Sequence, residues 1–385
     1  MQRYDQLDSL RGVACLMVLL NHFLLVLPQF VIPVHSLEGY WLVKLIRYTP
    51  LRVIWAGHEA VMLFFILSGF VLALPFLAKQ NTIYIPFAVK RVFRIYIPYL
   101  TAIFVAIALS ATYPGEISGL SSWLNEFNWN TAFSWSLLAD HLLLITNFDT
   151  GAYDQVIWSL VHEMRISLLF PLIMTAVIRF HWRWVTLLGL FVSALVLVHW
   201  TWYSVTLHYT FMFAVGALLA KHREALIRRY KETSYIVKAG FMIAAILLFG
   251  FFKLPSWVLP FGNPSLIKFA TDWGNTVGAA MLILAALSGG RFTSVLLFKP
   301  VHFIGKISYS IYLYHVILLL VSINLLYGIL PIWLILIIAF AGTIGVSALS
   351  YYWIELPSMA WGKAAARRAQ RLLARGTAAP LTKDA

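Results

Sequence analysis

The first hydrophobic stretch of the chain, residues 10–27, reads LRGVACLMVLLNHFLLVL and holds an arginine and a histidine among mostly apolar residues. Arg11 and His22 lie eleven positions apart. At ~100° per residue, an α-helix brings the two side chains to within ~20° of one face, ~16 Å apart along the axis. An ionisable side chain in a bilayer costs roughly 2.5–3.5 kcal/mol. A stripe with two of them therefore predicts a buried functional site within a helical bundle.

The composition indicates an all-α, polytopic integral membrane protein. Hydrophobic residues make up 61% and charged residues 11% of the 385 residues, and the mean hydropathy is +0.82, which excludes an ordinary soluble domain. We interpret the N-terminal segment as a retained anchor, because it has no clear small-x-small cleavage site. The apolar stretches predict about ten transmembrane helices, at residues 10–27, 60–78, 95–111, 158–178, 185–201, 204–220, 235–252, 272–288, 307–325 and 331–352.

A further apolar run, at residues 135–148, does not count as a crossing. It is short for a hydrocarbon core of ~30 Å and contains Asp140 and His141, which favours a re-entrant or interfacial segment. With ten crossings and both termini in the cytoplasm, the inside segments hold 21 of the 29 lysines and arginines. An eleventh crossing would move the basic cluster at 221–231 outside, against the positive-inside rule.

Charge and cysteine content restrict the partners. The net charge of +14 comes from basic residues dispersed over short cytoplasmic segments, so we expect membrane lipids and no nucleic acid as partners. Because Cys15 is the only cysteine, the chain has no internal disulfide or cysteine cluster, and we expect no metal. We assign residues 1–358 to the transmembrane domain and 359–385 to a basic cytoplasmic tail, with an amphipathic helix at 361–375 and a frayed end at 376–385.

Polar residues fall into two layers of the predicted bundle. The outer layer holds acid–base groups: His22, His58, Glu59, His162, Glu163 and Arg165. The inner layer holds cations: Arg11, Arg91, Arg94 and Lys306. Guanidinium groups bind phosphate bidentately, so the inner layer suits a polyanionic ligand. An imidazole beside a carboxylate can take the proton from a hydroxyl that attacks a thioester, which makes His22 and Glu163 the candidate catalytic pair.

These residues also have structural interpretations. A histidine in a helical bundle is often an interhelical hydrogen-bond partner, and this interpretation stays open for His315 in the sequence SYSIYLYH. Basic residues at a helix end can simply set the topology. The predicted outside segment 113–157 has five carboxylates, three tryptophans and no lysine or arginine. Such a surface suits a polyol, although interfacial tryptophans commonly form an aromatic belt.

An ordered series of motifs resembles the membrane-bound acyltransferase family 3. The series comprises LDSLRG at 7–12 with His22, FFILSGF at 64–70, KRVFRIYIP at 90–98, WSL at 158–160 with Glu163, ISYSIYLYH at 307–315 and a final motif at 352–357 with Glu355. It spans residues 7–358, nearly the whole chain. Many members have a second acidic residue after the motif glutamate, whereas this chain continues Met164-Arg165, which points to a different class of acceptor.

The resemblance implies transfer of an acyl group, commonly acetyl from acetyl-CoA, across a bacterial cytoplasmic membrane to a hydroxyl of a surface glycan or lipid-linked sugar. Acyl-CoA would be the donor, and His22 would be a general base or an acyl carrier. The expected catalytic residues are His22, Glu163 and Arg11. We expect the donor to contact Arg11, Arg91, Arg94, Lys306 and Tyr309. We expect the acceptor to contact His58, Glu59, Arg165 and His315.

Three alternatives stay open at the level of sequence. A transporter or flippase of lipid-linked sugars would also need many helices and intramembrane charges, but its paired interrupted helices are not evident. A structural partner in an envelope assembly would use the polar stripe only to hold helices together. An acyltransferase that modifies a cytoplasmic small molecule would keep the same donor site. The acyl length, the acceptor and the oligomeric state are not determined by the sequence.

Overall fold

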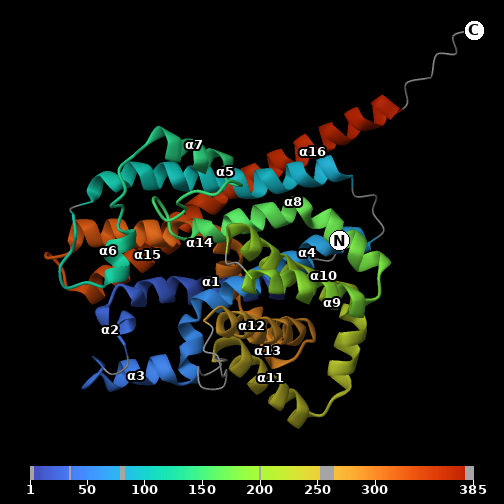
Figure 1. Ribbon diagram of the computed structural model, residues 1–385, viewed down its shortest axis with the longest axis horizontal. Coiled ribbons are helices and arrows are strands. Elements are labelled where there is room, and N and C mark those ends of the chain that lie inside the picture. The colour runs from blue at the N-terminus through green and yellow to red at the C-terminus, as the bar shows by residue number, and fades with distance from the viewer. Residues whose placement is uncertain are drawn as a thin grey trace, which may run out of the picture.

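The structure is a computed structural model that describes residues 4–33, 36–78, 83–113, 115–198, 201–251 and 264–377, the last four as backbone only. Within these ranges every regular element is a helix, and the one β-bridge, between Tyr327 and Leu330, is isolated. The predicted all-α class is therefore confirmed. Figure 1 shows long helices lying roughly along a common direction, with most of the short helices at the edges of the bundle.

Each of the ten predicted segments coincides with a helix; residues 199, 200 and 252 of two of these segments lie outside the described residues. They are α1 (Asp5–Leu25), α4 (Gly57–Leu77), α5 (Tyr84–Leu109), α8 (Ile157–Arg179), α9 (Trp182–Ala194), α10 (Trp202–Glu232), α11 (Tyr235–Gly250), α12 (Pro264–Leu287), α14 (Lys299–Leu326) and α15 (Ile332–Ser350). In the described part of the chain, seven helices are long and apolar enough to cross a membrane: α1, α4, α5, α8, α10, α14 and the continuous helix that begins with α15. The stretches Trp182–Leu197 and Tyr235–Gly250 form shorter apolar helices.

Several helices extend beyond their hydrophobic stretches. The helix α5 begins at Tyr84 instead of residue 95, α14 begins at Lys299 instead of residue 307, and α10 continues to Glu232 instead of ending near residue 220. Hydropathy marks the part of a helix that matches hydrocarbon, and it does not mark where backbone hydrogen bonding stops. Residues Arg91, Arg94 and Lys306, expected in connecting segments, consequently lie on helices.

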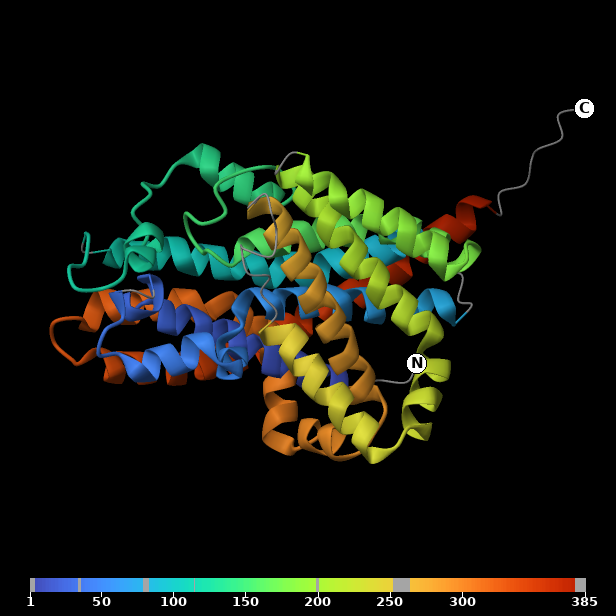
Figure 2. The same ribbon diagram turned by 60° about the horizontal axis from the view of Figure 1, so that its bottom comes forward.

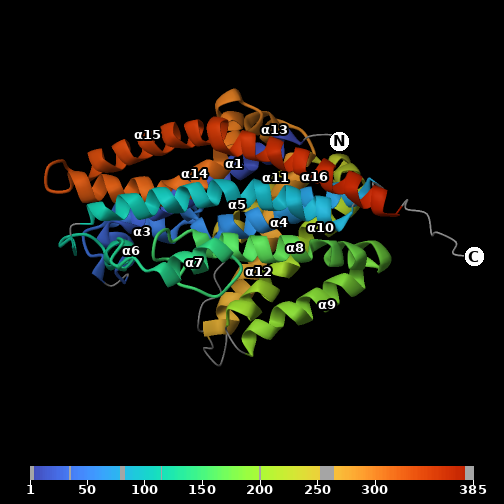
Figure 3. The same cartoon turned by 90° about the horizontal axis from the view of Figure 1, so that it is seen from above.

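Different helices lie at the two ends of the bundle. The helix α16 (Leu356–Thr377) projects from one end, here called the α16 end, and the short helix α6 (Ser122–Phe127) covers the other, here called the α6 end (Figures 1 and 3). Within the bundle, α4 packs against α1, α10 and α12. Figure 2 shows α11 and α12 side by side and inclined steeply to the long helices.

The helices α1 and α14 pack in register along their length. A Cβ atom on Gly12 would lie 2.6 Å from the backbone nitrogen of Gly305, so only glycines allow this approach. The same offset of 293 residues relates Cys15, whose sulfur lies 3.1 Å from the carbonyl oxygen of Ser308, and His22, whose ring contacts that of His315. Small residues let membrane helices approach closely, since lipid offers them no hydrophobic reason to associate. One register therefore fixes every α1–α14 contact.

The segment between α5 and α8 covers the α6 end and one side of α5. It contains α6 and α7 (Trp135–Leu143), and α7 has nine residues, or ~14 Å, too few to cross a bilayer. The hydroxyl of Tyr99 on α5 donates to the carbonyl oxygen of His141 at 3.0 Å and also lies 3.0 Å from its ring Nδ1. The prediction that 135–148 does not span the membrane agrees with this arrangement.

The predicted boundary at residue 358 falls inside continuous helix. After α15 the chain makes a π-helical turn at Tyr351–Glu355 and continues directly as α16, which packs along α5. The side chain of Glu355 in this turn accepts a hydrogen bond from Ser310 on α14 at 3.0 Å. The amphipathic helix expected at 361–375 is thus the continuation of the last membrane helix, and most of the expected frayed end lies outside the described residues.

Replacement of Gly69 by alanine tests the close packing of α4 against α10. A Cβ atom at Gly69 would lie 2.1 Å from the carbonyl oxygen of Phe213. Because overpacking a well-packed core typically costs about 1–3 kcal/mol, we expect a lower unfolding temperature in detergent. Gly240, beside which a Cβ atom meets nothing within 4 Å, provides the matched control, Gly240→Ala, which should leave this temperature unchanged or raised. Equal unfolding temperatures for the two variants would contradict the packing.

His141 makes the stability of the α7 segment depend on pH. Burial lowers the pKa of His141 to about 4, against the raising effect of the nearby Asp149 and Asp140 carboxylates. The unfolded chain then binds the proton first, so stability is lost as the pH falls from about 6.5 toward 4. The unfolding temperature should fall less between pH 7 and pH 5 in His141→Gln than in the unchanged protein. Equal falls in the two proteins would refute this assignment.

Candidate functional site

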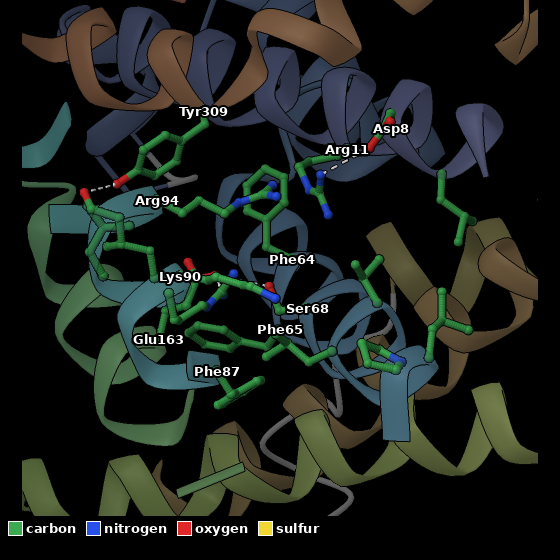
Figure 4. A pocket seen from close by; sticks show the side chains of 18 of the residues that line it. Asp8, Arg11, Phe64, Phe65, Ser68, Phe87, Lys90, Arg94, Glu163 and Tyr309 are labelled. Carbon is green, nitrogen blue, oxygen red and sulfur yellow. Dashed lines mark hydrogen bonds and ion pairs between the residues drawn. The ribbon is translucent and has the colours of Figure 1, made fainter. Parts of the chain in front are cut away.

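A cavity of about 810 Å³ lies between α1, α4, α5, α8 and α14, in the half of the bundle nearer the α16 end. Its volume is within the range of roughly 300–1,000 Å³ typical of ligand pockets. Four cations and two carboxylates line it, which leaves a formal charge of +2: Arg11, Lys90, Arg91 and Arg94 against Asp8 and Glu163. Figure 4 shows Arg11, Lys90, Arg94 and Glu163 around the same space as the aromatic residues Phe64, Phe65 and Phe87.

Arg11 and Arg94 reach toward each other across the cavity from α1 and α5 (Figure 4). Arg11 forms an ion pair with Asp8 at 3.3 Å, one turn away on the same helix. Among the residues that the structure describes, neither Arg94 nor Lys90 makes a hydrogen bond or an ion pair. Like charges repel strongly where the surroundings exclude water, so a bound anion would stabilise this arrangement.

Arg91 is already paired. Its guanidinium forms an ion pair with Glu163 on α8 and donates to the hydroxyl of Ser167 at 3.0 Å. Glu163 also accepts from Ser68, in the FFILSGF stretch of α4, at 3.1 Å. Removal of one partner of a buried ion pair commonly costs about 3–5 kcal/mol. Arg91 and Glu163 therefore join α4, α5 and α8 and form one wall of the cavity.

Two tyrosines of α14 complete the inner wall. The hydroxyl of Tyr309 donates to the carbonyl oxygen of Ile95 on α5 at 2.8 Å, which holds α14 against α5. One turn later, the hydroxyl of Tyr312 lies 2.6 Å from that of Ser159 on α8, and its ring packs edge to face on Phe64. Tyr312, Ser159 and Phe64, here called the partition, close the deep end of the cavity.

A pair of imidazoles lies beyond the partition. His22 Nδ1 and His315 Nε2 are 2.8 Å apart, and the two rings stack with centroids 5.0 Å apart. His22 also stacks against Trp123 of α6, with ring centroids 5.5 Å apart and an angle of 18° between the rings. The ring centroids of Tyr312 and His315 are 5.9 Å apart, so the partition packs directly against the imidazole pair.

The hydrogen bonds of His315 determine which nitrogen of His22 is a base. His315 Nδ1 lies 3.0 Å from the carbonyl oxygen of Ile311 and 2.8 Å from that of Tyr312. Carbonyl oxygens only accept, so Nδ1 of His315 holds the proton and its Nε2 accepts. His22 must then donate through Nδ1, which leaves the lone pair on its Nε2. Such a chain is the usual way to orient an imidazole as a general base.

Comparison with known families identifies the chain. A family model described as an acyltransferase domain matches residues 4–352. The chain belongs to the acyltransferase 3 family. It is a multi-pass membrane acyltransferase, and the resemblance seen in the sequence motifs is confirmed. Comparisons with curated proteins and with solved structures give no match.

The structure of the acyltransferase corrects the expected neighbour of His22. Glu163 was expected at the same depth, but it lies on the cavity wall against Arg91, and His315 takes the place beside His22. The expected depth of Glu163 came from counting residues from the outer end of each helix. That count assumes that all helices begin at the same depth in the membrane. The helix α8 begins at the level of Tyr312, whose hydroxyl donates to the carbonyl oxygen of Val156 at 3.3 Å, so Glu163 lies deeper in the bundle than His22. His315, expected to contact the acceptor, is fully buried and contacts His22 instead.

His58 and Glu59 belong to a separate polar network. His58 Nε2 lies 2.7 Å from Asp272 on α12, and the other oxygen of Asp272 lies 3.3 Å from Nε2 of His208. Glu59 pairs with Arg52 at 2.5 Å. Asp272 is buried, and an acid within a predicted membrane helix was a signal in the sequence that could have revealed this network.

Arg165 and Lys306 also lie apart from the cavity. Arg165 donates to the carbonyl oxygens of Ile145 and Thr146, at 2.9 and 2.7 Å, and so anchors the covering segment. Lys306 is exposed and is not among the described residues that line the cavity. Sequence reasoning missed Ser68, Ser159 and Tyr312 as site residues, although each lies in a motif quoted above. It also missed Gln370, for which the sequence holds no signal.

Proposed function

We propose that this acyltransferase moves an acyl group, in the commonest case acetyl, from acyl-CoA to a hydroxyl of a surface carbohydrate. The observation that supports the proposal best is the juxtaposition of a cationic cavity with an oriented imidazole pair. The cavity would admit the donor from the α16 end, and the pair would act on the acceptor from the α6 end. We infer that the protein lies in a bacterial cytoplasmic membrane with the α16 end and both termini in the cytoplasm, as the distribution of basic residues favours.

The donor matches the cavity in charge and shape. Acyl-CoA joins a polyanionic nucleotide to a narrow, nearly uncharged arm that ends in the thioester. In our proposal Arg11, Lys90 and Arg94 bind the phosphates nearest the arm, since guanidinium groups suit phosphate oxygens. The arm would extend between Phe64 and Tyr309 to the partition. Arg91 would orient Glu163 and the wall, while Tyr309 would fix the distance between α5 and α14.

The contact between Tyr312 and Ser159 in the partition must open before the acyl group can be transferred. Its hydrogen bond between Tyr312 and Ser159 closes the direct route from the cavity to His22. We propose that rotation of the Tyr312 side chain lets the thioester carbonyl approach the His22 ring. The released tyrosine hydroxyl would then be able to donate to the carbonyl oxygen as negative charge develops there.

The proposed chemical step uses the lone pair on His22 Nε2. As the acceptor oxygen forms a bond to the acyl carbon, Nε2 takes the hydroxyl proton, and the carbon–sulfur bond breaks to release the CoA thiolate. The imidazolium then protonates the thiolate, so the ester and free CoA are the products. His315 stabilises the positive charge on His22 by accepting from Nδ1. In the alternative order, His22 Nε2 itself carries the acyl group before the acceptor binds.

The acceptor side is supported by the α6 region. A hollow of about 160 Å³ is lined by Glu126, Asn130 and Asp149, next to the helix that carries Trp123. Carboxylates and an amide beside aromatic rings suit the hydroxyls of a sugar. Trp129 does not contribute a free face, because it is buried and donates to the carbonyl oxygen of Tyr153 at 2.8 Å. We propose that a glycan or a lipid-linked sugar enters here.

Cells that make this protein should contain more acylated envelope glycan than cells that lack it. The gain should vanish with His22→Gln, because glutamine has no titratable ring nitrogen. His181→Gln, at an exposed position, is the matched control and should retain the gain. Mass spectrometry of released glycans gives the measurement. Full acylation by the His22 variant would exclude His22 as base or carrier, and unchanged glycans in all strains would exclude the proposed acceptor.

Two substitutions of His315 separate orientation from packing. His315→Phe fills the space but leaves Nδ1 of His22 without an acceptor, so we expect the transfer rate to fall by roughly 10²–10⁴. His315→Gln supplies an amide oxygen that can accept from Nδ1, so it should retain much more activity and the same pH profile. Equal losses in the two variants, at equal unfolding temperatures, would contradict the orienting role.

A further inference from the structure

The basic helix α16 forms part of the cavity wall. Its residue Gln370 is among those that line the cavity, at the edge nearest the α16 end, here called the mouth. The helix is held against α5 by small residues at a spacing of four: Ser358 donates to the carbonyl oxygen of Phe93, Gly362 faces the side chain of Phe93, and Ala366 is buried. A Cβ atom at Gly362 would lie 3.7 Å from the Cα of Lys90, so α16 packs on the turn that presents the cavity cations.

Helix geometry places two cations of α16 on the helix face that carries Gln370, the α16 residue that lines the cavity. Lys363 lies seven residues before Gln370, a rotation within ~20°, and Arg367 lies three residues before it, within ~60°. Both side chains are exposed, and neither forms an ion pair in the part of the chain that the structure describes. Arg368 lies ~160° from Gln370 and points away from the mouth. The basic residues of α16 therefore differ in their position relative to the cavity.

The mouth has a second feature that favours anions. The helix α5 begins there, at Tyr84, and Ile83 and Pro86 line the cavity beside it. Its N-cap residue, Ile83, makes no side-chain hydrogen bond to the first turn. The exposed N–H groups and the helix dipole therefore present partial positive charge at the mouth, beside α16, which packs along α5.

We propose that Lys363 and Arg367 bind the phosphate groups of the donor that project beyond the cavity, at the nucleotide end of acyl-CoA. The inference rests on the proposed donor and assigns the far end of that donor to α16. The acyl group and the arm occupy the cavity, Arg11, Lys90 and Arg94 hold the phosphates next to the arm, and α16 holds the outermost phosphate. Anionic lipid headgroups offer the same phosphate chemistry, so the test distinguishes the two sources.

Binding of coenzyme A to the full-length protein tests the inference without any transfer reaction. In nanodiscs of zwitterionic lipid, isothermal titration should give a dissociation constant for coenzyme A that rises roughly tenfold in the double variant Lys363→Gln/Arg367→Gln. The matched control Arg368→Gln should bind as the unchanged protein does. For pantetheine, which has no phosphate, no variant should change the affinity.

The outcomes separate the inference from the proposed function. If the unchanged protein does not bind coenzyme A, the proposed donor and the inference both fail. If it binds, and the double variant binds equally well, the inference alone fails. A loss that appears only when the nanodiscs contain anionic lipid would assign the two cations to lipid headgroups and overturn the inference. An equal loss in Arg368→Gln would show a general effect of charge and would also overturn it.

Discussion

The close, in-register contact between α1 and α14 is the constraint on which the site depends. Gly12 and Gly305 allow the two backbones to touch, and a Cβ atom on Gly305 would lie 2.5 Å from the carbonyl oxygen of Asp8. This contact fixes the offset of 293 residues along both helices, so it brings His22 to His315 at one end of the pair. A shift of either helix by one residue would rotate its imidazole by ~100° relative to the other ring and break the hydrogen bond.

The structure divides the interior into a charged cavity and an imidazole pair, with a thin partition between them. The two compartments differ in charge. The cavity concentrates cations that need an anion, whereas the imidazoles form a neutral chain whose protons are fixed by two carbonyl oxygens. The partition keeps the cavity cations away from His22. Cations close to His22 would oppose its protonation. The arrangement suits a reaction whose donor and acceptor come from opposite sides of a membrane.

The sequence predicted the positions of the helices better than the contacts between them. Hydropathy located all ten segments, because burial in hydrocarbon demands long apolar runs. Hydropathy misplaced the first residues of α5 and α14, because it shows which residues face hydrocarbon and not where a helix begins. It also misplaced the depth of Glu163, because it does not show how far into the bundle a helix lies. The contact of His22 with His315 joins residues far apart in the chain, and no local pattern encodes such a pairing. The spacing of Ser358, Gly362 and Ala366 was a readable signal that the tail packs against another helix.

The central claim is that the donor lies in the cavity with its thioester at the partition. A cryo-electron microscopy map of the protein with a stable thioether analogue of acetyl-CoA tests it most directly. The account predicts density for the phosphates beside Arg11, Lys90 and Arg94, and density for the sulfur beside Tyr312. Density for the analogue at the α6 end, or on the surface with the cavity empty, would contradict the account.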